Sequence, residues 1–250
     1  MKITEDRWLG NLLTYPVFKV DAQQVDIFEI ERHLTENSDA MYFCKVNTSE
    51  SRTVLKLTSA GFYIVDTNVS FTRDTSPARL AVDTKCVIRP FKKSDESEIL
   101  KIAYESFVYS RFHLDPLIDR EAANRIKKEW IQSYIDKKRG DVLAVGTIED
   151  RPVGFMGLLS NNTAKVFDLM AVDKQFRRFK IGHSLVAFLI DEYRNSCDRF
   201  EIGTQISNIP SIRLFENHGF TTHASQYILH MHIRKGTRCE LGSLIHAKEF

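Results

Sequence analysis

The stretch that decides the fold reads KVFDLMAV at residues 165–172 and DKQFRRFKIGH at residues 173–183. The first part has the apolar character of a strand, and the second is a basic loop that opens a helix. Unpaired backbone N–H groups and the positive end of the helix dipole meet at such a point, so the loop is suited to bind a diphosphate. Gly182 would let a phosphate approach the backbone closely. Solvated basic loops also open many helices, so the pattern alone leaves an ordinary surface loop open.

Regular elements extend on both sides of this stretch. Apolar runs bounded by turn residues predict strands, and apolar residues at helical spacing predict amphipathic helices. The predicted strands lie at residues 86–90, 199–205 and 225–232, with a β-hairpin over 141–159, and the predicted helices lie at residues 94–107, 121–137, 180–189 and 210–218.

The chain is predicted to have two domains. Residues 1–75 mix short apolar runs with polar residues and indicate a small α/β unit, and residues 70–85 are rich in Ser, Thr, Asp and Arg, as in an exposed connection. We therefore expect a small domain over residues 1–80 and a larger one over residues 81–250.

Composition excludes several classes of partner. The 35 Lys and Arg residues nearly balance the 33 Asp and Glu residues, so no strong field favours nucleic acid or an anionic membrane. The four cysteines form no CxxC or Cys/His spacing, and we expect reduced thiols and no bound metal. No apolar run is long enough to span a bilayer and the N-terminus lacks the form of a secretory signal, so a cytoplasmic protein is expected.

Two motifs resemble those of the GNAT acetyltransferases. Residues 165–182 are similar to that family's acetyl-CoA segment, in which a strand ends in Leu/Met-Ala-Val-Asp before [Q/R]-x-x-G-x-[G/A]; Arg177, Ile181 and Gly182 match. Residues 208–220, NIPSIRLFENHGF, resemble the later segment N-x-x-[SA]-x-x-L-[YF]-E-x-x-G-F. The resemblance covers about residues 85–235. It implies the GNAT fold, a mixed and mostly antiparallel twisted sheet flanked by helices, preceded here by the smaller α/β unit.

The resemblance also implies how acetyl-CoA would be held. The main chain of the strand would bind the pantetheine arm, with an N–H near Met170 stabilising the oxyanion, and the amides from Arg178 to His183 would bind the pyrophosphate. Asn208 would bind the pantetheine. The implied cofactor residues are Met170, Ala171, Val172, Arg177, Arg178, Phe179, Lys180, Ile181, Gly182, His183, Asn208 and Phe215.

Two residues depart from the family pattern. Lys180 replaces the first glycine of the loop, which either hinders close approach or adds a cation. Phe215 stands where these enzymes commonly have a Tyr that protonates the thiolate, and solvent, Tyr227 or His183 are the alternatives. Asp168 is a candidate base, because strand alternation would put it on the same face as the catalytic Met170; the alternative is a structural carboxylate.

A second resemblance concerns the acceptor. Residues 60–68, with Ser70-Phe71, and residues 110–116 are similar to the bacterial TDP-fucosamine acetyltransferases, which acetylate the C4 amine of a TDP-4-amino-4,6-dideoxyhexose. From their chemistry Arg111 and Phe112 could hold a diphosphate and a base or sugar, and Asp115 completes the candidate set. The alternative is a helix end with Phe112 in the core.

Three hypotheses remain at this point. The first is direct transfer from acetyl-CoA to an amino-sugar nucleotide in lipopolysaccharide-type biosynthesis, without an acyl-enzyme, since no partnered nucleophile is evident. The second is a GNAT enzyme that acetylates a protein terminus or another small amine. The third is a non-catalytic CoA-binding module. A homodimer would be consistent with the family.

Overall fold

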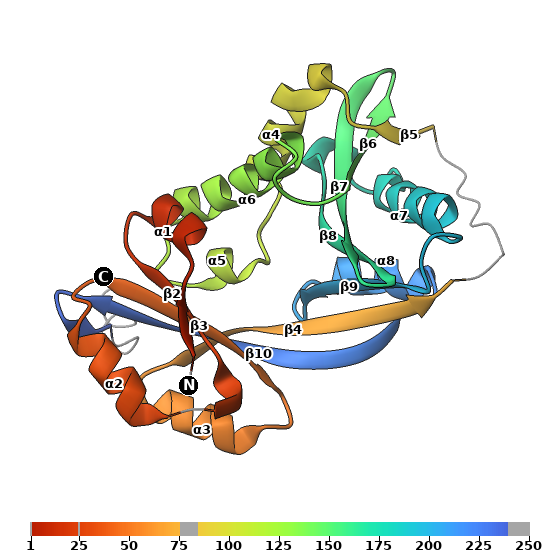
Figure 1. Ribbon diagram of the computed structural model, residues 1–250. Helices are drawn as coiled ribbons and strands as arrows, with labels where there is room; N and C mark the ends of the chain where they lie inside the picture. The colour runs from red at the N-terminus through yellow and green to blue at the C-terminus, as the bar shows by residue number, and fades with distance from the viewer. Residues whose placement is uncertain (1, 25, 76–84, 240–250) are drawn as a thin grey trace. The chain divides into compact units, whose positions relative to one another are not determined.

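The computed structural model describes residues 2–24, 26–75 and 85–239 and has a mixed α/β fold, as predicted (Figure 1). The expected domain boundary near residue 80 lies outside the described residues. The described chain instead divides into two compact units that interleave in sequence. The first unit takes its described residues from 1–68, 114–117 and 225–250, and the second takes its own from 69–113 and 118–224. This division differs from the expected one because a C-terminal strand returns to the first unit, where it pairs with an early strand.

The first unit is a sheet in the order β1-β2-β3-β10-β4, with β11 added to β10. Helix α1 begins after Asp6, whose side chain accepts from Leu9 N, and α2 begins after Asp26, which accepts from Phe28 N. The elements are β1 Ile3–Glu5, α1 Arg7–Leu13, β2 Val17–Val20, α2 Ile27–Thr35, β3 Ala40–Asn47, α3 Ser51–Ser59, β4 Tyr63–Asp74, β10 Thr221–Arg234 and β11 Thr237–Arg238; β4 and β10 also run into the second unit.

The second unit is a sheet in the order β4-β9-β8-β7-β6-β5. Helices α4 and α6 share one apolar core with the sheet, and α7 shares another on the opposite face (Figure 1). The elements are β5 Val87–Pro90, α4 Glu96–Glu105, α5 Arg111–Leu114, α6 Arg120–Ile135, β6 Val142–Ile148, β7 Arg151–Asn161, β8 Ala164–Val172, α7 Ile181–Tyr193, β9 Arg199–Gln205 and α8 Ile209–Asn217.

The start of α7 lies close to the sheet because two glycines leave room for it. A Cβ at Gly146 would stand 3.2 Å from Ile181 Cγ2, and one at Gly154 would stand 3.1 Å from the same atom. Ile181 is fully buried there. The two glycines therefore fix how near the first turn of α7 comes to β6 and β7.

A bulge interrupts the alternation of β8 at Asp168. Leu169 pairs with Gly157 on β7, but the next pair along joins Phe167 to Leu158, so Asp168 is an extra residue in its strand. Phe167 accordingly packs in the core beneath α7 and Leu169 in the core beneath α4 and α6. The expectation that Asp168 shares a face with Met170 is wrong, since a bulge turns the residue after it to the other face.

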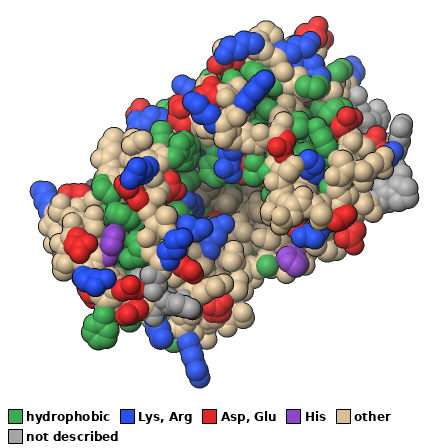
Figure 2. Space-filling view, in the orientation of Figure 1, with side chains coloured by type: hydrophobic (Ala, Val, Ile, Leu, Met, Phe, Trp, Pro, Cys, Tyr) green, Lys and Arg blue, Asp and Glu red, His purple; other side chains and the backbone are tan. Residues whose placement is uncertain are grey.

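Basic and acidic side chains are interspersed over the face seen in Figure 2, in keeping with the small net charge. Among the described residues, none of the helices has the length and apolar character that crossing a membrane requires. The four cysteines are all free thiols.

Candidate active site

The carboxyl end of β8 separates from its parallel neighbour β9. Their pairing runs from Ala164↔Arg199 to Phe167↔Ile202, whereas β8 continues to Val172. On its other side β8 stays paired with β7 through Val172. Residues 168–172 therefore form a strand segment paired on one side, whose remaining backbone groups are available to an extended, amide-containing chain.

The helix that follows begins without a capping side chain. Lys180 is the N-cap residue of α7 and makes no side-chain capping hydrogen bond, and the first intrahelical bond runs from Ser184 N to Lys180 O at 2.9 Å. The amides of Ile181, Gly182 and His183 thus precede the first helical donor and are open to an anion. The helix is 13 residues long and largely buried, so its dipole is fixed against the sheet.

The loop between β8 and α7 has an unusual backbone. Arg178 has φ 71° and Lys180 has φ 59°, both in the left-handed region. Glycine adopts this left-handed conformation without strain, which explains why it suits position 180. Lys180 stands there instead and adds a cationic side chain to the loop. A Cβ at Gly182 would lie 3.3 Å from Leu214 Cδ2, so the first turn of α7 also packs closely on α8.

The basic side chains of this loop differ in their roles. Arg177 donates from Nη2 to the carbonyl of Ser106 at 3.0 Å, which ties the loop to the end of α4. Arg178 and Lys180 are exposed, as is Phe179 at 60%. Arg178 and Lys180 are therefore the cations left for a phosphate, while Arg177 holds the loop in place.

Asn208 caps α8. Its side chain accepts from Ser211 N, and its amide nitrogen donates to Thr204 Oγ1 at 3.1 Å. The family-implied contact of Asn208 with pantetheine stays a prediction, and the structure adds a capping role. Ala171 is buried and Val172 partly buried on β8.

Phe215 lies in the core of the second unit at 2% exposure, with its ring centroid 6.3 Å from that of Phe71 and 5.9 Å from that of Phe220. Nearby, His183 Nδ1 and His218 Nε2 lie 3.1 Å apart and join α7 to the end of α8. Burial lowers the pKa of His218 to about 4, assisted by His183, and burial also lowers the pKa of His183. Burial therefore favours the neutral form of both imidazoles, which makes His183 a poor proton donor.

Asp168 is held by four donors from α6 and the turn after it. Trp130 Nε1 and Tyr134 Oη each donate to Oδ2 at 2.9 Å, and Arg139 donates to Oδ2 at 2.7 Å and to Oδ1 at 2.8 Å. Burial alone would raise the carboxyl pKa, but these hydrogen bonds and the Arg139 charge bring it below its usual value. A carboxylate so occupied fits the structural alternative rather than a base.

Met170 faces the other side of the sheet and lies against the first turn of α7. A Cβ at Gly182 would stand 3.9 Å from Met170 Cε, and Met170 packs against the core beneath α7. The side chain of Met170 therefore reaches the first turn of α7, and its backbone N–H is the donor that the resemblance implies for the oxyanion. That role itself stays a prediction.

The remaining predicted residues are distributed over both units. Arg111 and Phe112 belong to the second unit, with the guanidinium carbon of Arg111 4.6 Å from the ring centroid of Phe112. Phe112 is 2% exposed, which fits the alternative of a core residue. Asp115 and Tyr227 belong to the first unit. Asp115 is buried and hydrogen-bonded to His230. Tyr227 pairs with Val46 and packs on the apolar core of that unit. Buried Asp115 offers no surface to a sugar.

Sequence reasoning missed several residues near the site. Trp130, Tyr134 and Arg139 lie 29 to 38 residues from Asp168 in the chain, and no local pattern links them. Lys127 of α6 is also buried, with Nζ 4.6 Å from the Trp130 ring, and burial lowers its pKa to about 8. Only its position on the apolar side of a predicted helix could have drawn notice.

A splayed strand edge, a basic loop and an uncapped helix start on this sheet agree with the GNAT fold that the two sequence motifs predict. Residues 99–220 match the family model described as Acetyltransferase (GNAT) family, and this part of the chain is a GNAT domain.

Two named relatives share part of the sequence. The spore coat polysaccharide biosynthesis protein SpsD of Bacillus subtilis (strain 168) is 34% identical over 143 residues, which are 57% of this chain and 49% of that protein. N-alpha-acetyltransferase 30 of Dictyostelium discoideum is 43% identical over 54 residues, 21% of this chain and 29% of that protein. The match thus spans about half of the first relative and less of the second.

Solved structures share the fold. A GCN5-related N-acetyltransferase from Sphaerobacter thermophilus superimposes with a TM-score of 0.58 at 17% identity, covering 84% of this chain and 66% of that one. A tandem GNAT protein from the clavulanic acid biosynthesis pathway gives a TM-score of 0.59 at 11% identity, covering 90% and 76%. At these identities the likeness is one of fold alone.

Proposed function

We propose that the protein is an N-acetyltransferase that moves the acetyl group of acetyl-CoA to the amine of a nucleotide-linked amino sugar, a TDP-4-amino-4,6-dideoxyhexose. The observation that carries the transferase part is the open edge of β8 beyond Phe167↔Ile202, followed directly by the uncapped start of α7. These features fit the two polar parts of CoA, an amide-containing arm and a diphosphate. When bound, acetyl-CoA would supply an activated thioester.

The residues of the second unit divide the work. Backbone groups of residues 168–172 bind the pantetheine arm, and the amides of Ile181, Gly182 and His183 bind the diphosphate with Arg178 and Lys180 nearby. A main-chain N–H at Met170 stabilises the oxyanion that forms when the amine attacks the thioester carbonyl. The new C–N bond forms, the C–S bond breaks, and the amine loses a proton to water.

Neither Asp168, the expected base, nor Phe215, at the position of the expected acid, can transfer a proton in this reaction. Phe215 has no proton to give and Asp168 is occupied by four donors. Water is therefore our proposal for the acid that protonates the thiolate, which is a tolerable leaving group. Loss of a positioned acid lowers the rate by about 10²–10⁴ without abolishing transfer.

Transfer is direct. An acyl-enzyme would need a thiolate, but burial raises the pKa of both Cys86 and Cys197. A free amine attacking bound acetyl-CoA then needs no covalent intermediate. Trapping acetylated Cys86 or Cys197 during turnover would overturn this route.

The amino-sugar acceptor rests on two supports. Residues 60–71 and 110–116 resemble the TDP-fucosamine acetyltransferases, and the relative SpsD is named for spore coat polysaccharide biosynthesis. Arg111, partly exposed at the start of α5, is the cation we assign to the acceptor's diphosphate. A second candidate acceptor is a protein amino terminus, favoured by the 43% identity to N-alpha-acetyltransferase 30 over 54 residues.

A thiol-release assay with acetyl-CoA separates these functions. The panel contains a TDP-4-amino-4,6-dideoxyhexose, the same sugar nucleotide with a 4-hydroxyl, peptides with free amino termini, and a polyamine. We expect turnover with the amino sugar alone and an N-acetylated product by mass spectrometry. Turnover with peptides only would establish the second candidate, and calorimetric CoA binding without turnover on any amine would establish a non-catalytic module.

A further inference from the structure

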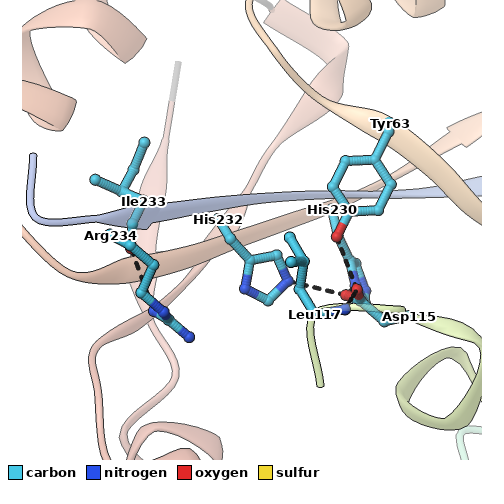
Figure 3. A network of polar contacts seen from close by, with 7 residues as sticks. All are labelled: Tyr63, Asp115, Leu117, His230, His232, Ile233 and Arg234. Atoms are coloured by element: carbon cyan, nitrogen blue, oxygen red, sulfur yellow. Dashed lines mark hydrogen bonds and ion pairs between the residues drawn. The ribbon is translucent and has the colours of Figure 1, made fainter. Parts of the chain in front are cut away.

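Three side chains converge at one point inside the first unit (Figure 3). His230 and His232 stand two residues apart on β10, so their side chains leave the same face of the strand. Asp115 lies in the four-residue segment 114–117 of the same unit. His230 Nδ1 is 2.6 Å and His232 Nε2 is 2.9 Å from Asp115 Oδ2, and all three side chains have 0% exposure.

We propose that Asp115, His230 and His232 bind one divalent transition-metal ion, with Zn²⁺ as the ion that two imidazoles and a carboxylate suit. The three ligand atoms lie within 4.8 Å of one another. Zn²⁺ binds N and O ligands at about 2.0–2.2 Å, which places tetrahedral ligand atoms about 3.4 Å apart. The two N···O contacts therefore open by about 0.5–0.8 Å to admit the ion, and a water molecule takes the fourth position.

The two oxygens of the Asp115 carboxylate have different partners, so that one oxygen is held in place and the other faces the imidazoles, where a metal ion would bind. Oδ1 accepts from Tyr63 Oη at 2.7 Å and from Leu117 N at 2.9 Å (Figure 3). These bonds fix the carboxylate and leave Oδ2 aimed at both imidazoles. Tyr63 and Leu117 thus act as the outer partners that orient a ligating carboxylate.

Complete burial determines how the ion would enter. A site without exposed ligand atoms is assembled as the chain folds, so the ion is bound during folding and its binding free energy adds to that of folding. Chelator should therefore remove the ion from the unfolded chain much faster than from the folded protein. The expectation from cysteine spacing that no metal binds did not consider the His-x-His pair on a strand.

The test uses the full chain without a histidine tag. Protein is unfolded in guanidinium with EDTA, freed of both, and refolded with or without Zn²⁺; metal is then counted by inductively coupled plasma mass spectrometry. We expect about one Zn per refolded chain and a melting temperature several degrees above that of the metal-free sample. The variants are Asp115→Asn and His232→Gln, and exposed His223 of the same strand, as His223→Gln, is the matched control.

The two site variants should retain less than about a tenth of the wild-type zinc, and zinc should not move their melting temperatures. His223→Gln should match the wild type. If a site variant fails to fold, the wild-type comparison with and without zinc still decides. Wild-type protein that refolds equally well, melts at the same temperature and holds no zinc would overturn the proposal and leave a cluster held by hydrogen bonds alone.

Discussion

Arg139 holds Asp168 through two parallel hydrogen bonds, from Nε to Oδ2 at 2.7 Å and from Nη2 to Oδ1 at 2.8 Å. The pair connects the turn after α6 to the bulged residue of β8. Because the bulge directs Asp168 toward α6 and Met170 toward α7, the carboxylate supports the strand on which the thioester would lie. It is a positioning residue in our account.

Asp168→Asn should therefore cost stability more than chemistry. The variant leaves the partly buried guanidinium of Arg139 without its counter-charge. We expect the free energy of unfolding to fall by about 1–3 kcal/mol. This value is smaller than for a fully buried pair because the Arg139 side chain is 37% exposed and water screens its charge. The turnover number should fall less than about tenfold. Urea denaturation and thiol-release kinetics measure the two effects, and exposed Asp136→Asn serves as control. A loss of about 10² or more in turnover with unchanged stability would restore Asp168 as the base.

Phe215→Tyr should not restore an acid. The ring is 2% exposed among other phenylalanines, so a new hydroxyl enters the core without a partner and should lower the free energy of unfolding by about 1–3 kcal/mol. We expect no rise in the turnover number. Phe215→Leu, which adds no polar atom, separates loss of packing from the effect of the hydroxyl. A faster Tyr variant with a new group in its pH–rate profile would show that the hydroxyl reaches the thiolate.

Lys180→Gly should stabilise the fold and weaken the cofactor site. Relief of the left-handed conformation, partly offset by glycine's entropy, should raise the free energy of unfolding by about 0.5–1 kcal/mol. Loss of the cation should raise KM for acetyl-CoA a few-fold, with a smaller effect at high salt. Lys180→Asn, which also tolerates this conformation, should raise KM equally. Unchanged KM in both variants would remove Lys180 from the diphosphate site.

The sequence predicted the parts of the site that follow from local order. The run from Lys165 to Gly182 places a strand, a loop and a helix start in succession, and any fold that keeps these elements brings backbone amides to the same edge. It could not predict the bulge at Asp168, because the extra residue is defined only by pairing with Gly157 and Leu158 on β7. Trp130 and Arg139 were missed for the same reason.

The division of the chain into two units likewise could not be predicted from local sequence patterns. The strand at 225–232 was predicted, but its register with β3, in which Leu229 pairs with Cys44, joins residues that are far apart in the sequence. Alternating apolar residues predict that a strand has a buried face and say nothing of which strand lies beside it.

The buried His218, which contacts the partly buried His183, should make stability depend on pH. The pKa of His218 falls from 6.5 to about 4 on folding, chiefly through burial. Between these values the unfolded chain binds a proton that the folded protein does not, so the free energy of unfolding rises with pH and is lost as pH falls from about 6.5 toward 4. His218→Gln keeps a hydrogen-bonding group beside His183 but cannot titrate. We expect guanidinium denaturation at a series of pH values to show a wild-type loss larger by about 1–3 kcal/mol than that of the variant, with the difference confined to this window. Parallel curves for the two proteins would mean that His218 keeps an ordinary pKa, and the imidazole pair would then be able to carry a proton at the end of α8.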